Sequence, residues 1–111
     1  MKEIDKLNKY INQYYTCNRA DGETLLMLLQ KITALLYYLE TVRGEVHNAY
    51  ETHVFNCVKD GQSVARAVNE ANVTYPQMYQ LRRLMDGAYR IVDAIRTNIS
   101  YLKSEMNNIN K

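Results

Sequence analysis

The sequence predicts an all-α protein: an elongated antiparallel helical hairpin of two long helices, with a short N-terminal helix and a small connecting helix. The 47% hydrophobic residues, 1 proline and 4 glycines exclude a disordered chain and disfavour a sheet with many tight turns. Two long stretches also repeat apolar residues at alternating steps of three and four. A chain of 111 residues supports one core, so we expect a single helical domain over residues 1–111.

The first helix is expected over residues 3–15. Its apolar residues share one face, because they recur at alternating steps of four and three: Ile4, Leu7, Ile11 and Tyr14. The next segment, residues 16–22, has the composition of a turn. Either Asn18 or Asp21 can cap the second helix, by accepting a hydrogen bond from one of its first backbone N–H groups.

The second helix is expected over residues 22–58. Apolar residues fill consecutive a and d positions of a heptad repeat there, namely Leu25, Leu28, Ile32, Leu35, Leu39, Val42, Val46 and Ala49. Gly44 interrupts the stretch, and a glycine inside a helix costs about 1 kcal/mol relative to alanine. We still expect one continuous helix, because the apolar register is unchanged across Gly44. The helix then ends at Asp60-Gly61.

A short helix over residues 63–72, with Ser63 as its N-cap, leads into a fourth helix over residues 76–108. Pro76 suits the first turn of that helix, where a backbone N–H is not needed. Apolar residues fill ten successive a and d sites of the fourth helix: Met78, Leu81, Met85, Ala88, Val92, Ile95, Ile99, Leu102, Met106 and Ile109. The connection between the long helices lets them run antiparallel.

The second helix carries apolar side chains beyond the seam that it shares with the fourth. Exposed apolar patches of several hundred Å² usually mark interfaces, so we expect a second copy of the chain to cover part of this surface. The protein is therefore predicted to assemble as a homo-oligomeric helical bundle. Its expected interface residues are Leu26, Met27, Leu29, Leu36, Tyr37 and Tyr38.

The charged residues predict binding through a local patch. The chain has 14 basic and 12 acidic side chains and a net charge of +2, so it lacks the strong basicity of a histone-like DNA coat. Arginines cluster on the first half of the fourth helix, and tyrosines offer rings on which bases stack. The residues expected to bind nucleic acid or a nucleotide are Arg66, Tyr75, Tyr79, Arg82, Arg83, Arg90 and Arg96.

Two plainer interpretations of the same residues stay open. Asp86 and Asp93 lie three or four residues from the fourth helix's arginines, so the patch is also explained as a solvated, salt-bridged helix face. Tyrosines also occur often as half-buried side chains that separate packed helices. A helix-turn-helix over residues 67–83 is a further alternative, but its recognition helix would continue for about 30 residues as a regular heptad, whereas recognition helices are short.

The sequence lacks the patterns of an enzyme, a metal centre or an exported protein. No serine lies in a nucleophile elbow, and there is no glycine-rich phosphate loop. His53 and Cys57 are one helical turn apart, but two ligands are too few for a zinc site, so we expect no metal and no cofactor. Cys17 and Cys57 are too few for a disulfide framework. We expect a cytoplasmic protein with reduced cysteines and no membrane contact.

Three segments resemble small all-helical accessory proteins of tailed bacteriophages: Asp60 to Ala67 (DGQSVARA), Tyr79 to Arg83 (YQLRR) and Ala94 to Lys103 (AIRTNISYLK). The resemblance implies a recombination-mediator-like factor that binds single-stranded DNA through Arg66, Arg82, Arg83, Arg90 and Arg96. An alternative is a phage anti-defence protein, either an anti-CRISPR inhibitor of a host defence protein or a sponge for signalling nucleotides. A second alternative is a helical protein–protein interaction module that binds through residues 25–39.

Overall fold

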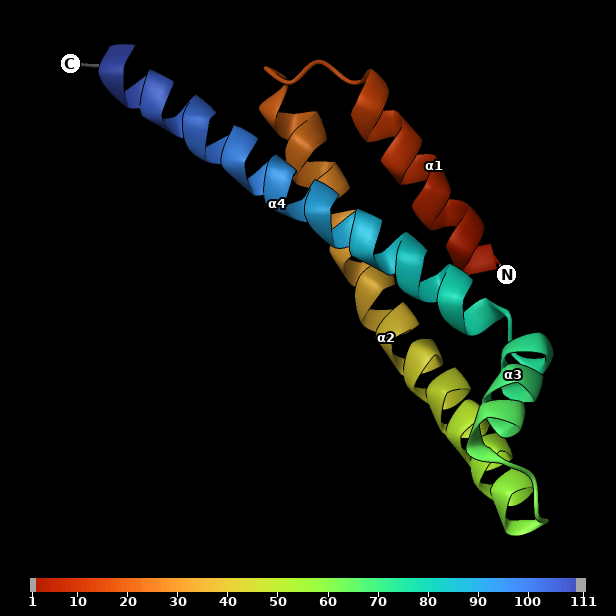
Figure 1. Ribbon diagram of the computed structural model, residues 1–111. Coiled ribbons are helices and arrows are strands. Elements are labelled where there is room, and N and C mark those ends of the chain that lie inside the picture. The colour runs from red at the N-terminus through yellow and green to blue at the C-terminus, as the bar shows by residue number, and fades with distance from the viewer. Residues whose placement is uncertain (1, 110–111) are drawn as a thin grey trace. The chain divides into compact units, whose positions relative to one another are not determined.

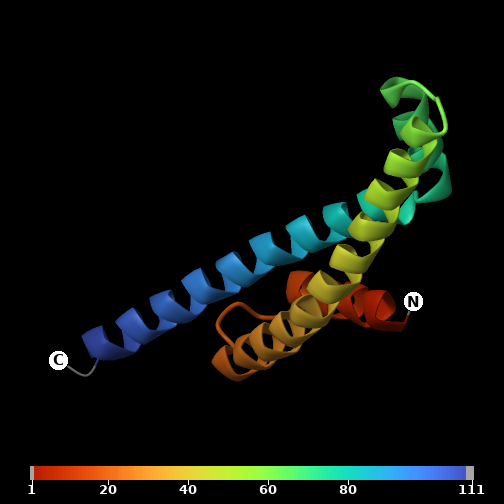
Figure 2. The ribbon, with the colours of Figure 1, turned by 90° about the horizontal axis from the view of Figure 1, so that it is seen from below.

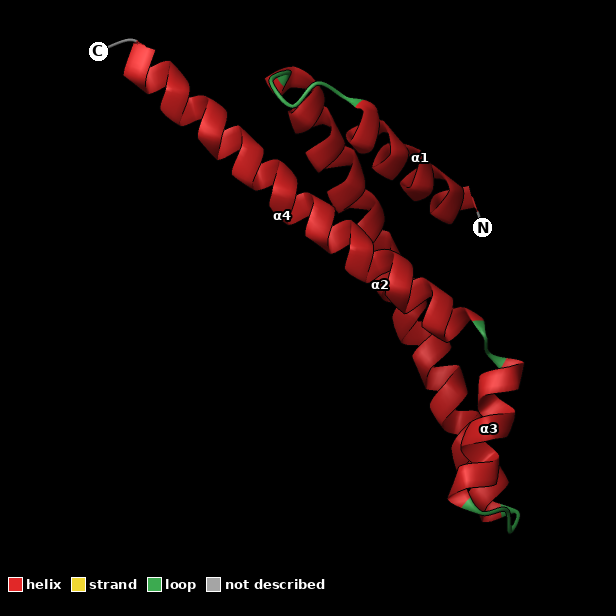
Figure 3. Ribbon diagram, turned by 45° about the horizontal axis from the view of Figure 1, so that its top comes forward, coloured by secondary structure: helices red, strands yellow, loops and turns green. Residues whose placement is uncertain are grey.

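The computed structural model describes residues 2–109 and shows an all-α protein (Figures 1 and 3). The helices are α1 (Lys2–Thr16), α2 (Gly22–Lys59), α3 (Val64–Thr74) and α4 (Gln77–Ile109), and the described residues include no strand. The all-α prediction is confirmed. Each helix begins and ends within two residues of the range expected from the sequence, and α2 runs through Gly44 as one helix.

Side chains and one glycine fix the ends of the helices. Asp21 caps α2, because its Oδ1 atom accepts a hydrogen bond from the Thr24 backbone N–H at 3.1 Å. Asn18 instead accepts from the Ala20 N–H in the preceding turn. Ser63 caps α3 by accepting from the Arg66 N–H at 3.2 Å. Gly61, with a φ of 100°, ends α2 with bonds from Gly61 N–H to Val58 O and from Gln62 N–H to Cys57 O.

The chain divides into two compact units, and each long helix contributes to both of them. Unit 1 comprises Met1–Tyr38 with Met85–Lys111, and unit 2 comprises Leu39–Leu84. Unit 1 therefore contains α1, the first part of α2 and most of α4. Unit 2 contains the second part of α2, all of α3 and the first residues of α4. The expectation of a single domain stays a prediction.

Unit 1 is built around an apolar core. Its buried side chains come from all three of its helices, namely Leu7, Tyr14, Leu25, Leu28, Ile32, Leu36, Met85, Ala88, Ile91, Val92 and Ile95. The Tyr14 hydroxyl accepts a hydrogen bond from Asn98 Nδ2 at 3.3 Å, which joins α1 to α4. A Cβ atom added at Gly22 would lie 3.8 Å from Leu102, so the start of α2 lies beside a late turn of α4 and the two segments run in opposite directions.

The placement of Leu36 in an intersubunit surface needs correction. Leu36 is 3% exposed and belongs to the core of unit 1, whereas Leu35, the expected seam residue, is half-buried. A helix in a globular protein buries a wider stripe than the a and d positions alone, and Leu36 falls inside that stripe. Among the other expected interface residues, Met27 and Leu29 are half-buried, while Leu26, Tyr37 and Tyr38 are exposed. These side chains remain available to a second copy.

Helix α2 is long and apolar enough to cross a membrane, judged by length and composition alone. Core helices of soluble proteins pass the same test. In the structure, Leu25, Leu28, Ile32 and Leu36 of this helix are buried in the core of unit 1. Only 28% of the apolar stretch of α2 is buried, whereas a core helix is mostly buried, so burial does not decide between the two, and the absence of membrane contact stays a prediction.

Candidate functional site

Unit 2 brings α3 against the second part of α2. Both Figure 1 and Figure 2 show α3 alongside this part of α2. Ala67 and Ala71, one turn apart on α3, are completely buried, and their small side chains allow close packing with neighbouring helices. The Tyr50 hydroxyl on α2 donates a hydrogen bond to Asn72 Oδ1 on α3 at 2.9 Å. These contacts fix which side chains of the two helices face each other.

A hollow of about 410 Å³ lies where the end of α3 meets the start of α4 within unit 2. We call it the tyrosine hollow. It is lined by Tyr50, Asn72, Tyr75, Pro76, Met78, Tyr79 and Arg82. The Tyr79 side chain is 70% exposed, which leaves its ring open to solvent. The Tyr75 ring is half-buried and packs edge-on against the His53 ring, with centroids 5.8 Å apart.

Arg82 also lines a second hollow, of about 470 Å³, together with Glu40, Arg43, Gly44, His47 and Met78. Within this second hollow Arg43 Nη2 forms an ion pair with Glu40 Oε2 at 2.8 Å. Arg43 is thus neutralised by a neighbour on its own helix. Arg82 and Met78 line both hollows. Among the residues that line the tyrosine hollow, Arg82 is the one with a cationic side chain.

The arginines of α4 are not engaged by the aspartates of the same helix. Within residues 2–109, no ion pair shorter than 4.0 Å joins Asp86 or Asp93 to Arg82, Arg83, Arg90 or Arg96. All four arginines are exposed. A fully salt-bridged helix face therefore does not describe this surface, and the arginine charges remain available to an anion.

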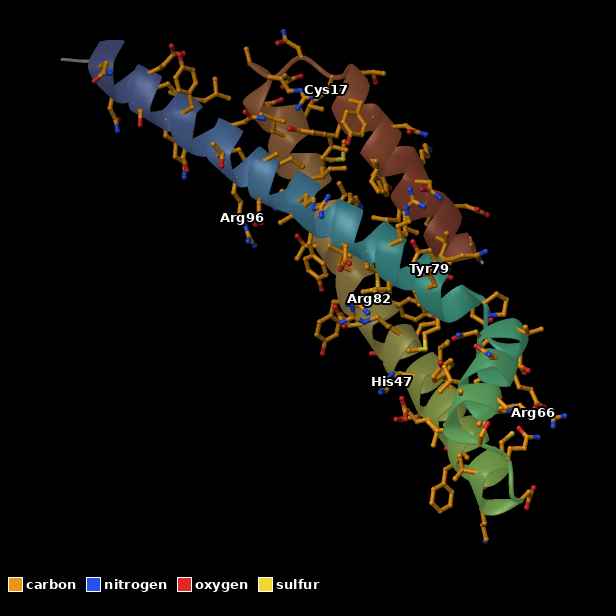
Figure 4. All side chains as sticks on the ribbon, viewed as in Figure 1. Cys17, His47, Arg66, Tyr79, Arg82 and Arg96 are labelled. Atoms are coloured by element: carbon orange, nitrogen blue, oxygen red, sulfur yellow. The ribbon has the colours of Figure 1, made fainter. Side chains whose placement is uncertain are left out.

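Three of the seven expected binding residues line the tyrosine hollow: Tyr75, Tyr79 and Arg82. Arg83 is an exposed neighbour in unit 2, and Arg66 is exposed on α3; neither lines the hollow. Arg90 and Arg96 belong to unit 1. Figure 4 shows Tyr79 and Arg82 on the first turns of α4, Arg66 on α3 and Arg96 farther along α4.

Two lining residues were not expected to be functional. Tyr50 is not among the predicted binding residues, and Asn72 is predicted only as the end of the short helix. Their hydrogen bond joins residues 22 positions apart on two helices, so no spacing within one helix signals it. The structure also bears on the helix-turn-helix interpretation. Its turn is Tyr75-Pro76, and its second helix is the start of the 33-residue α4.

A second group of polar side chains lies between α2 and α3. His53, Cys57 and Glu70 each offer one potential metal-binding atom, and these three atoms lie within 4.8 Å of one another. The sequence suggested only the pair on α2, because Glu70 is 13 residues beyond Cys57 and on another helix. Burial, together with the negative charges of Glu70 and Asp60, raises the pKa of the Cys57 thiol.

Comparisons of this chain with protein-family models, with curated proteins and with solved structures found no match.

Proposed function

We propose that the protein acts by binding, without catalysis, and that it takes a single-stranded nucleic acid at the tyrosine hollow. One observation carries the proposal: tyrosine rings, a side-chain amide and an exposed arginine line the same hollow. Each of these groups matches a different part of a nucleotide. The proposal keeps the non-enzymatic, strand-binding role implied by the resemblance to phage accessory proteins.

Tyr79 supplies the stacking surface. Its exposed ring can pack on the face of a base, and such stacking tolerates any base because every base has a π-face. Tyr75 provides a second ring whose orientation is fixed by its edge contact with His53. Stacking of this kind contributes about 1 to 3 kcal/mol per base.

Arg82 and Asn72 supply the polar contacts. The guanidinium of Arg82 presents several N–H donors in one plane, which suits two oxygens of a phosphate. Asn72 Oδ1 already accepts from the Tyr50 hydroxyl, so the Asn72 side chain offers its Nδ2 donors to an acceptor on a base edge. The contacts favour a strand with unstacked bases over a duplex, in which these base faces are covered.

The test is the binding of a dye-labelled oligothymidine strand, followed by fluorescence anisotropy over a series of salt concentrations. Tyr79→Ala should weaken binding by about 1 to 3 kcal/mol. Arg82→Gln should weaken binding. It should also reduce the slope of the logarithm of the binding constant against the logarithm of the salt concentration by about one. Arg96→Gln is the matched control, because Arg96 is an exposed arginine of the same helix that belongs to unit 1.

The Arg82 and Arg96 variants decide where the strand binds. If Arg96→Gln weakens binding as much as Arg82→Gln, the strand follows α4 and the tyrosine hollow is not its site. A wild-type protein that fails to bind the strand at low salt contradicts the proposal altogether.

A free signalling nucleotide is the second candidate ligand, as in a phage anti-defence sponge. It is favoured because the expected residues gather in one hollow whose volume of about 410 Å³ lies in the range of small-ligand sites, while Arg90 and Arg96 are not among them. A cyclic dinucleotide would then raise the melting temperature, and long oligothymidine would not. The reverse result supports the strand.

A further inference from the structure

The His53–Cys57–Glu70 group has the composition and spacing of a metal site. His53 Nε2 lies 3.7 Å from one carboxylate oxygen of Glu70, and Cys57 Sγ lies 3.9 Å from the other. The bond lengths of tetrahedral zinc, about 2.0 to 2.3 Å, place neighbouring ligand atoms roughly 3.3 to 3.8 Å apart. The three side chains therefore need only small adjustments to close around one ion.

The imidazole nitrogen in this group has no other partner. Within the described residues, His53 Nε2 is buried from solvent and makes no hydrogen bond, since its 3.7 Å separation from Glu70 Oε1 is too long for one. A buried ring nitrogen without a partner is unfavourable. Coordination of a cation would satisfy it.

The helices hold these side chains in place for binding. His53 and Cys57 are separated by four residues on α2, so both lie on one side of the helix, and Glu70 faces them from α3. The His53 ring also packs edge-on against the Tyr75 ring. The Cys57 thiol donates a hydrogen bond to Glu70 Oε2 at 3.9 Å. Once the thiol loses its proton, a divalent ion between the thiolate and the carboxylate offsets the repulsion between their negative charges.

We propose that His53, Cys57 and Glu70 bind a zinc ion that links α2 to α3. The choice of metal follows from the ligands: imidazole and thiolate favour zinc over calcium or magnesium, which prefer oxygen. Three protein ligands leave a fourth tetrahedral position for water. Because Tyr75 contacts the His53 ring and also lines the tyrosine hollow, the ion would stabilise the wall of that hollow.

The experiment uses the full chain without a polyhistidine tag, reduced and stripped of metal with a chelator. Zinc is titrated by calorimetry, and cobalt(II) is titrated by absorption spectroscopy. We expect one zinc ion per chain, a higher melting temperature with zinc, and a thiolate-to-cobalt charge-transfer band in the near ultraviolet. A wild-type chain that gives neither the band nor one-to-one zinc binding overturns the proposal, whatever the variants do.

Three variants and one control assign the ligands. Cys57→Ser should abolish the cobalt band, and His53→Gln and Glu70→Gln should each weaken zinc binding at least about tenfold. Cys17→Ser is the control, because Cys17 is the other half-buried cysteine and its thiol is engaged by the Tyr14 carbonyl oxygen in unit 1. Loss of the band in Cys17→Ser, with its retention in Cys57→Ser, would overturn the assignment.

Discussion

Units 1 and 2 are held together in different ways. Unit 1 buries aliphatic side chains such as Leu28, Ile32 and Ile95 completely, and these come from both long helices. In unit 2, by contrast, the fully or nearly buried apolar residues are Leu39, Ala67, Ala71 and Leu81, and polar side chains join α2 to α3. The difference indicates that unit 1 serves mainly as the stable part of the chain. Both hollows described above and the His53–Cys57–Glu70 group lie in unit 2.

The largest effect is expected from a truncation in the core of unit 1. Leu28→Ala removes part of a side chain that is completely buried, so the free energy of unfolding should fall by about 2 to 5 kcal/mol. Urea denaturation followed by circular dichroism measures this change. If unit 1 is the stable part of the chain, the loss should be seen across the whole helical signal.

Leu26→Ala is the matched control, since Leu26 lies on the same helix but is 49% exposed. It should lower the free energy of unfolding by less than about 1 kcal/mol in dilute protein. Equal losses in the two variants would contradict the assignment of the core. A loss in Leu26→Ala that grows with protein concentration would support the second copy that the sequence predicts on this surface.

Smaller changes in the free energy of unfolding, of opposite sign, are expected when two glycines of unit 2 are replaced by alanine. A Cβ atom added at Gly44 meets nothing within 4 Å, so Gly44→Ala should raise the free energy of unfolding by about 0.5 to 1 kcal/mol through better helix propensity. Gly61 has a φ of 100°, which disfavours any side chain, so Gly61→Ala should lower it by about 1 kcal/mol. Thermal or urea unfolding compares them directly, and the same sign in both variants would contradict the helix end at Gly61.

The sequence predicted the parts of this structure that depend on neighbours along the chain. Periodicity placed the helices, Asp60-Gly61 and Ser63 marked helix ends, and Leu25, Leu28 and Ile32 were expected in the core. These signals are local, because a helix brings residues three and four apart onto one face. Local signals left open whether Asn18 or Asp21 caps α2, a choice settled by the hydrogen bond from Thr24.

Residues that meet across two helices gave no such signal. Glu70 completes the group with His53 and Cys57, and Asn72 meets Tyr50, only because α3 packs with one particular face toward α2. On that face Ala67 and Ala71 are completely buried, and the Tyr50–Asn72 hydrogen bond joins the same two helices. For the same reason, the arginine cluster of α4 was taken as one surface, whereas Arg82 belongs to unit 2 and Arg90 to unit 1.

The smallest expected effect concerns the cap of α2 in unit 1, and it depends on pH. Hydrogen bonds from the side chain and backbone of Thr24 lower the pKa of Asp21 below its ordinary value. A carboxyl group with a lowered pKa in the folded state contributes stability that is present above its unfolded pKa, about 3.9, and is lost as pH falls through the folded value. The wild-type chain should therefore lose this contribution when the pH is reduced from 7 to about 3.

Asp21→Asn separates this contribution from the titration of other carboxyl groups. Asparagine caps helices nearly as well as aspartate but carries no titrating group, so its capping is the same at both pH values. On acidification, the melting temperature of the wild-type chain should therefore fall by more than that of Asp21→Asn. A difference that is constant over this range would mean that the Asp21 carboxylate is not bound to Thr24 in solution. In that case the backbone hydrogen bond from the Leu25 N–H to Asp21 O and the core of unit 1 would hold the first turn of α2.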